Sequence, residues 1–314
     1  GAGVITTPLW VQADDQFIPV EDNFQRVITY TEEVTVNYSV NSSTVRSGEL
    51  RDADWKALKE LIQLSVDADS VTITGARIEA YASPEGEITL NEDLASDRAN
   101  SAAASMTREM KRKKLTADEA FYDLVPKGED WQGFKSLMQA SDIEDKNLIL
   151  RVLEMYSDKN KREEEIRNIA KTYKAIEKEI LPALRRSQVV VSYDVEGYTD
   201  EELMDYCMSM PDSLTADELL YAATLFADLN DKLTIYQSAA RVHANDFRGY
   251  NNAGWCLARM GRMNQAGEVF QQALELERNK AVVNNVAALT RQNGDIDGAM
   301  KLLNEAVGAG PEVG

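Results

Sequence analysis

The residues best suited to bind a ligand lie in one segment, 78–103, with the sequence IEAYASPEGEITLNEDLASDRANSAA. A polar turn around Ser83 and Glu85 is followed by Asn91 and Arg98 in a stretch typical of a helix. A planar guanidinium can clamp a carboxylate with two parallel hydrogen bonds, which makes Arg98 a candidate for binding an anionic group. The alternative is a helix-surface arginine paired with a nearby carboxylate: Glu79, Asp93 or Asp97. We expect Ser83 to fix the turn backbone rather than to touch a ligand.

Catalytic and metal-binding side chains are scarce in this chain. Cys207 and Cys256 are the only cysteines, and both fall in helical patterns typical of small buried residues. The single histidine, His243, lies near a predicted helix end, and the sequence has no Gly-rich phosphate loop, HExxH or CxxC. We therefore predict a protein that is not an enzyme and needs neither cofactor nor metal. Paired carboxylates such as Glu79 and Glu85 leave a glycan-cleaving enzyme as the last-ranked alternative.

Composition and charge exclude further classes. The 314 residues carry 53 acidic and 34 basic side chains, a formal net charge of -19, which argues against nucleic acid as a partner. Hydrophobic residues make up 44% of the chain, enough for buried cores, and no apolar run approaches the roughly 20 residues that cross a bilayer. The start, Gly1-Ala2-Gly3, has the character of a trimmed end, so we expect that an export signal was removed.

The elements that must position the ligand candidates alternate between strand and helix. Residues 1–30 have no sustained period and are interpreted as an N-terminal extended arm. The expected order then is a strand at 34–40, an amphipathic helix after 52, a strand at 71–80 bulged at 75, a helix at about 90–114, and a last strand at 187–195. The predicted fold class is an α+β mixed sheet with helices over residues 31–200, with a helical insertion at about 120–185. A linker at 201–211 leads to an all-α solenoid at 212–314.

A repeat of 33 residues organises this second part. Eight positions return 33 residues later: Tyr250, Ala253, Gly254, Leu257, Gly261, Ala266, Phe270 and Ala273 become Val283, Val286, Ala287, Thr290, Gly294, Ala299, Leu303 and Ala306. One helix pair cannot bury its apolar face alone, so neighbouring pairs must stack. The Gly-x8-Phe-x2-Ala frame resembles the tetratricopeptide repeat, with Pro311 in the family's closing-proline position. The array ends there without a polar cap, so we expect the natural protein to continue.

The tetratricopeptide resemblance implies a groove, lined by the first helices of successive units, that binds extended peptides. The groove candidates at the matching positions are Arg248, Asn251, Trp255, Arg259, Asn284, Arg291 and Gln292. Arginine and asparagine suit recognition of carboxylates and peptide backbone, and a tryptophan can anchor an interface. The alternative is that these are ordinary solvated helix residues, with Trp255 packed against a neighbouring unit.

The segment 78–103 resembles the peptidoglycan-binding motif of OmpA-like domains, in which an Asn and an Arg-Ala pair follow a strand and a polar turn. The combination of YASPEG, a helical insertion, PALRRS and helical repeats is similar to OmpA-like envelope proteins of Bacteroidetes. In that family an arginine takes the carboxylate of a peptidoglycan stem peptide and an aspartate takes its ammonium group. Arg98 occupies the arginine position, whereas Ser83 replaces the aspartate, and Glu85 lies two residues further on. The resemblance implies the peptidoglycan-ligand candidates Ser83, Glu85, Asn91 and Arg98.

The leading hypothesis is a non-catalytic cell-envelope scaffold in the periplasm, associated with the outer membrane. Its OmpA-like domain associates with peptidoglycan, and its helical repeats bind a protein or peptide partner. The alternative is a pure protein–protein adaptor whose OmpA-like domain has lost cell-wall binding, and the serine at position 83 favours it. The sequence does not identify the partner in the groove, the oligomeric state or a lipid anchor.

Overall fold

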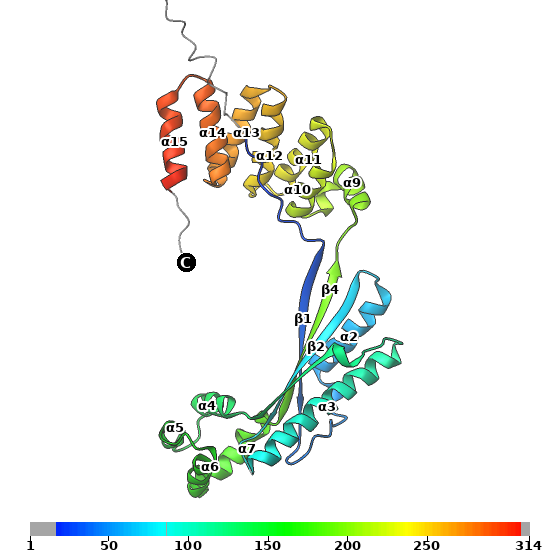
Figure 1. The fold of residues 1–314 in the computed structure, drawn as a ribbon, viewed down its shortest axis with the longest axis vertical. Helices are drawn as coiled ribbons and strands as arrows, with labels where there is room; N and C mark the ends of the chain where they lie inside the picture. Colours follow the sequence, from blue (N-terminus) through cyan, green and yellow to red (C-terminus); the bar gives the residue numbers. More distant parts are fainter. Residues whose placement is uncertain (1–16, 86, 309–314) are drawn as a thin grey trace, which may run out of the picture. The chain divides into compact units, whose positions relative to one another are not determined.

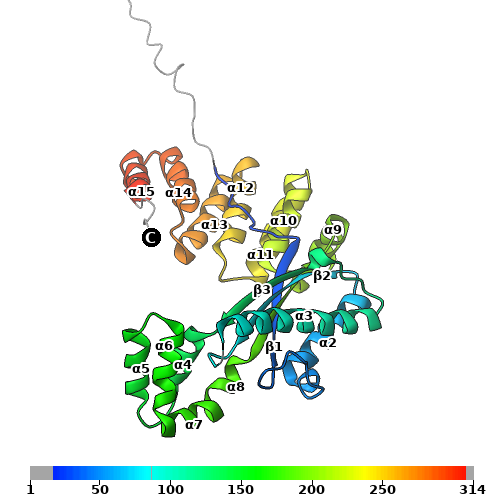
Figure 2. The ribbon, with the colours of Figure 1, turned by 60° about the horizontal axis from the view of Figure 1, so that its bottom comes forward.

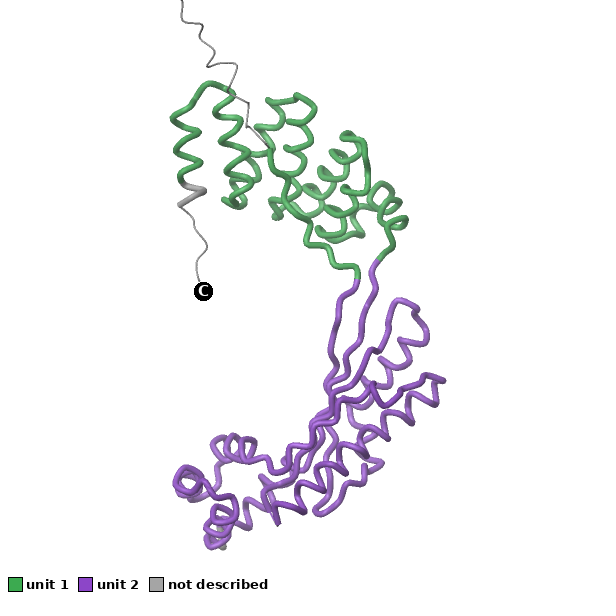
Figure 3. The backbone as a smooth tube through the Cα atoms, in the orientation of Figure 1, with its two compact units in different colours: residues 1–26, 198–314 green, residues 27–197 purple. Residues whose placement is uncertain are grey.

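A computed structural model describes residues 17–85 and 87–308, and contacts divide the chain into two compact units (Figure 3). Residues 27–197 form the first, here called the sheet unit. Residues 198–314 form the second, the repeat unit, together with the N-terminal segment that ends at Arg26. In the described ranges, no helix has the length and apolarity required to span a membrane.

The sheet unit is built on four strands in the order β1-β4-β2-β3. Their bounds are β1 Val27–Asn37, β2 Val71–Ala82, β3 Tyr122–Glu129 and β4 Arg186–Glu196. The β4 strand pairs antiparallel with both β1 and β2, whereas β2 and β3 are parallel, so the sheet is mixed as predicted. The bulge predicted at Gly75 is confirmed by a register shift between Ile73 and Gly75.

Two helices, α2 (Ala53–Asp67) and α3 (Ile88–Arg112), cover the same face of this sheet (Figures 1 and 2). The α2 side chains Trp55, Leu58, Leu61 and Ile62 are buried, as their spacing predicts. They join the inward side chains of the strands and a row of small α3 residues in one hydrophobic core. The alanines of α3 let this long helix lie close to the sheet, and its first two turns flank the polar turn at Ser83.

The predicted helical insertion at about 120–185 needs a correction at its start. Residues 122–129 form the edge strand β3, which Pro126 and Gly128 disguise in the sequence. A proline is tolerated there because an edge strand leaves one row of N–H groups without a neighbour. The helices follow as α4 Trp131–Ala140, α5 Lys146–Met155, α6 Lys159–Asn168, α7 Ala170–Glu179 and α8 Leu181–Leu184. They bury a separate small core around Phe134 and Ile149.

From residue 198 to residue 308, the regular elements of the repeat unit are all helices. Its helices are α9 Asp200–Ser209, α10 Ala216–Leu225, α11 Leu229–Val242, α12 Phe247–Arg259, α13 Met263–Leu276, α14 Lys280–Gln292 and α15 Ile296–Gly308. The predicted linker at 201–211 is wrong, because α9 occupies most of it and begins at a capping box in which Thr199 and Glu202 satisfy each other's backbone N–H groups. The pairs α10–α11, α12–α13 and α14–α15 are successive repeats. Gly261 and Gly294, 33 residues apart, end α12 and α14 with positive φ angles of 77° and 92°.

The N-terminal segment is the second correction to the predicted domains. Strand β1 begins at Val27, so the arm ends at Arg26 rather than at residue 30, and residues 1–16 lie outside the described part. Residues 17–26 run without regular secondary structure along the helices of the repeat unit (Figures 1 and 2). We call these ten residues the strap. The described part of the expected arm, residues 17–26, is therefore an integral part of the repeat unit.

Candidate functional site

The sheet-unit candidates meet at the turn that joins β2 to α3, but their polar groups bind each other. Arg98 is 0% exposed and donates to three backbone carbonyls: Ser42 O at 3.0 Å, Tyr81 O at 2.8 Å and Ser39 O at 3.3 Å. Its guanidinium also lies over the Tyr38 ring, 5.1 Å from the centroid. Burial lowers the pKa of Arg98 to about 10. Neither Glu79, Asp93 nor Asp97 is among these partners, so the predicted surface ion pair is wrong.

The remaining turn residues form a compact network around Arg185. The Glu85 carboxylate accepts hydrogen bonds from Ser83 Oγ at 2.6 Å and from Arg185 Nε at 2.9 Å. Asn91, which is buried, donates to Glu85 O at 3.2 Å and to the Glu129 carboxylate at 3.0 Å. The arginine that pairs with Glu85 is thus Arg185, which immediately precedes β4 and was not among the predicted ligand-binding residues. A hollow of about 510 Å³ beside the turn is lined by Glu85, and Arg98 is not among the residues that line it.

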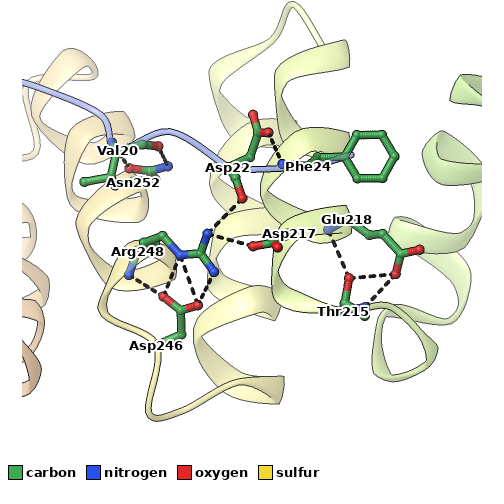
Figure 4. Close-up of polar contacts among 9 residues, drawn as sticks. All are labelled: Val20, Asp22, Phe24, Thr215, Asp217, Glu218, Asp246, Arg248 and Asn252. Atoms are coloured by element: carbon green, nitrogen blue, oxygen red, sulfur yellow. Dashed lines mark hydrogen bonds and ion pairs between the residues drawn. The ribbon is translucent and has the colours of Figure 1, made fainter. Parts of the chain in front are cut away.

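A second constellation lies in the repeat unit, where asparagine side chains hold the main chain of the strap. Asn252, on α12, accepts from Val20 N–H at 2.7 Å and donates to Val20 O at 2.9 Å (Figure 4). Asn285, on α14, accepts from Ile18 N–H at 2.7 Å and donates to Ile18 O at 2.8 Å. Each carboxamide therefore satisfies both backbone groups of one residue, as a neighbouring β-strand would. Such pairing recognises the backbone of an extended segment and does not depend on the side chain of the paired residue.

These asparagines are connected and buried. Asn251 donates to Ile18 O at 3.0 Å, and its own Oδ1 accepts from Asn285 Nδ2 at 2.9 Å. Asn251 and Asn285 are 0% exposed and Asn252 is 2% exposed. A buried carboxamide without a partner costs roughly 1–3 kcal/mol, so these helices need a polypeptide backbone, or water, against them. The strap supplies that backbone.

Arg248 fixes the strap one step further along the chain (Figure 4). Its guanidinium donates to Asp22 O at 2.8 Å and forms ion pairs with Asp217 of α10 at 2.7 Å and with Asp246 at 2.6 Å. Burial alone raises the pKa of Asp246, but the hydrogen bonds from Arg248 outweigh burial and hold this pKa below its usual range. The hydrogen bond to Asp246 is also the main cause that raises the pKa of Arg248. One cation thereby joins two successive repeats and the strap.

Aromatic side chains anchor the two ends of the strap. The Phe17 ring stacks on Phe270 of α13 with centroids 5.9 Å apart, and the Phe24 ring stacks on Tyr221 of α10 at 4.4 Å. Arg26 lies over the Phe24 ring and donates to Tyr198 O at 2.6 Å and to the Asp200 carboxylate. The strap therefore contacts the repeat unit from α9 to α14.

The helix pairs, their spacing and this peptide-holding face can be compared with known proteins. Residues 247–280 match the tetratricopeptide repeat. This stretch spans α12 and α13 and confirms the repeat predicted for that unit. A curated relative, "BBSome complex member BBS4" from Xenopus tropicalis, is 26% identical over 157 aligned positions, which cover 46% of this chain and 30% of the relative. The chain thus spans less than a third of the length of this relative.

The groove positions of the tetratricopeptide repeat predicted part of the site that holds the strap. Arg248 and Asn251 contact the strap, but Trp255 and Arg259 instead stack on each other, 5.8 Å from guanidinium carbon to ring centroid. Asn284 donates to Asn285 at 3.4 Å, and Arg291 takes part in other interactions.

Asn252 and Asn285 were not among the predicted groove residues. Asn252 directly follows the predicted groove residue Asn251, and Asn285 directly follows the predicted groove residue Asn284. Their signal in the sequence is the Asn-Asn pair at 251–252, which returns 33 residues later at 284–285. Pro311, in the predicted closing-proline position, and Gly86 of the turn lie outside the described residues.

Proposed function

We propose that this protein is a non-catalytic protein-interaction scaffold whose helical repeats bind an extended polypeptide through its main chain. The observation that carries the proposal is the pair of asparagine clamps, Asn252 on Val20 and Asn285 on Ile18. The clamps recur at the repeat spacing, on the face where tetratricopeptide units hold peptides. The similarity to a protein named as a member of a complex agrees with an interaction role.

The sheet unit acts, in this proposal, as a rigid base rather than as a cell-wall receptor. Two observations favour this adaptor alternative. Arg98 donates its hydrogen bonds to backbone carbonyls of the sheet unit, and Arg185 forms an ion pair with Glu85. Sedimentation of the intact chain with purified sacculi tests the choice, and we expect the protein to stay in the supernatant. Retention that Glu85→Gln abolishes would instead support binding of the peptidoglycan stem peptide. The periplasmic, outer-membrane-associated location belongs to the proposal through the OmpA-like resemblance alone.

The scaffold function is tested with a chain whose strap cannot be clamped. The double change Ile18→Pro and Val20→Pro removes the two N–H groups that the clamps accept and keeps the backbone extended. This full-length strap variant is used to select binders from a library of unstructured peptides. The same selection is run in parallel on the variant that also carries Asn252→Ala and Asn285→Ala. We expect peptide capture by the first protein and its loss in the second. Equal capture by both proteins would reject the asparagine groove as the binding site.

A further inference from the structure

The two ends of the strap are held by its side chains, whereas its middle is held by backbone. Phe17 and Phe24, seven residues apart, lie on Phe270 and Tyr221, and Arg26 pairs with Asp200. Between the two rings, Ile18 is 42% exposed and Pro19, Glu21 and Asn23 are also exposed, whereas Val20 and Asp22 are partly buried. Selectivity for the sequence of a bound segment would therefore come from the two aromatic side chains near its ends.

We infer that the strap is an intramolecular pseudo-ligand, and that it exchanges with a segment of another polypeptide of the same chemistry. That partner segment is extended, carries two aromatic side chains seven residues apart and a basic residue two positions after the second. It also has unblocked N–H groups one and three positions after the first aromatic residue. This inference rests on the proposed function, because it names the ligand of the same groove.

Because the three asparagines are buried, replacement of the strap by another segment is more favourable than release of the strap to leave an empty groove. Removing the strap leaves Asn251, Asn252 and Asn285 without its backbone groups, so a second extended backbone gains what the strap gave up. The strap has no internal helix or sheet to preserve. Its dissociation thus breaks only the contacts that an incoming segment restores.

The strap competes as a covalently attached ligand. A segment joined by a short connection acts at an effective concentration on the order of millimolar, so a free segment with the same contacts binds far more weakly than it would to an open groove. Weakening the strap must therefore increase the affinity for a free peptide. This relation separates a pseudo-ligand from a structural segment that never leaves.

The experiment measures binding of a fluorescein-labelled peptide, FIPVEDNFQR, to full-length protein by anisotropy. We expect the wild-type chain to bind it at least tenfold more weakly than the chain with Ile18→Pro and Val20→Pro. A full-length Phe24→Ala chain serves as a second strap-weakened protein, and Glu21→Ala, at an exposed strap position, is the matched control with wild-type affinity. A probe with both phenylalanines replaced by alanine should bind the strap-weakened chains at least tenfold more weakly than the original probe.

Each outcome separates the inference from the proposed function. If the two probes bind a strap-weakened chain equally well, the aromatic rule is wrong while main-chain binding stands. If wild-type and strap-weakened chains bind the original probe equally well, the strap does not compete and the pseudo-ligand is rejected. If neither probe binds but the strap-weakened chain captures library peptides, the inference fails alone. Absence of binding by any peptide overturns the proposed function itself.

Discussion

The carboxamide of Asn252 pairs with both backbone groups of Val20, accepting from its N–H at 2.7 Å and donating to its carbonyl at 2.9 Å. The two residues are 232 positions apart in the chain, so the contact closes a long loop. One repeat further on, Asn285 makes the same pair with Ile18. In the proposed function, the site that holds the protein's own extended segment also accepts an extended segment of another chain.

Removal of either clamp should destabilise the repeat unit. Asn252→Ala leaves the N–H and the carbonyl of Val20 without this partner. Asn285→Ala leaves the Ile18 N–H without its partner, while Asn251 still donates to the Ile18 carbonyl. We expect each change to lower the free energy of unfolding by about 1–3 kcal/mol. Urea unfolding followed by circular dichroism measures it. Asn264→Ala, at an exposed position of α13, is the control and should stay within roughly 0.5 kcal/mol of wild type. Equal stabilities for all three variants would contradict a structural contribution from the clamps.

The ion pairs of Arg248 predict a pH dependence. The pKa of Asp246 is held below its ordinary value of 3.8, so its stabilising contribution is complete above that value and is lost as the pH falls through the lower, folded pKa. We expect Asp246→Asn, which keeps the oxygen that caps α12, to be less stable than wild type at pH 7. Urea unfolding from pH 7 to pH 3 should show a constant difference down to about pH 5 that shrinks below pH 4. A difference that grows in acid would refute the assigned pKa direction.

Two glycines of the second repeat should respond in opposite ways to alanine. A Cβ on Gly254 of α12 would lie 2.7 Å from the buried Phe270 ring, so Gly254→Ala should cost about 1–3 kcal/mol through overpacking. At Gly267 of α13 the nearest atom is Leu289 Cδ1 at 3.7 Å, an ordinary contact. There alanine should stabilise the helix by roughly 0.5–1 kcal/mol. Thermal unfolding of both variants checks the pair, and a stable Gly254→Ala would disprove the close α12–α13 packing.

Arg98 should matter for folding even when no ligand is present. Arg98→Met keeps much of the side-chain volume but removes every donor from the carbonyls of Ser39, Ser42 and Tyr81. We expect the unfolding free energy of the sheet unit to fall by about 3 kcal/mol or more, because hydrogen bonds from a charged donor are among the stronger ones. If Arg98→Met were as stable as the wild type, the arginine would be dispensable for the fold and would again be a candidate for ligand binding.

Local patterns allowed much of the fold to be predicted. The spacing of Trp55, Leu58 and Ile62 identified the buried face of α2, because the helical period depends on neighbouring residues only. Strand β3 was missed, because Pro126 and Gly128 weaken the strand pattern and its parallel pairing with β2 joins residues that are distant in the sequence. Helix α9 had a readable signal in the capping box of Thr199 and Glu202.

The sites were harder to predict, because partners distant in sequence decide what a polar side chain does. Arg98 was a ligand candidate by its position, but whether its donors reach a ligand or Tyr81 O depends on how α3, the end of β2 and the loop after β1 meet. The groove residues Arg248 and Asn251 followed from the repeat frame. Nothing local marks the segment from Phe17 to Arg26 as their occupant, because more than 200 residues separate it from α12.

Amide hydrogen exchange at Ile18 and Val20 tests the central claim most directly, since the two N–H groups donate to Asn285 and Asn252. We predict that both amides exchange at least tenfold more slowly in the full-length chain than in the free peptide FIPVEDNFQR. Asn252→Ala should remove the protection of Val20, and Asn285→Ala that of Ile18. Exchange at the free-peptide rate in the wild-type chain would contradict a strap held by its main chain on the helical repeats.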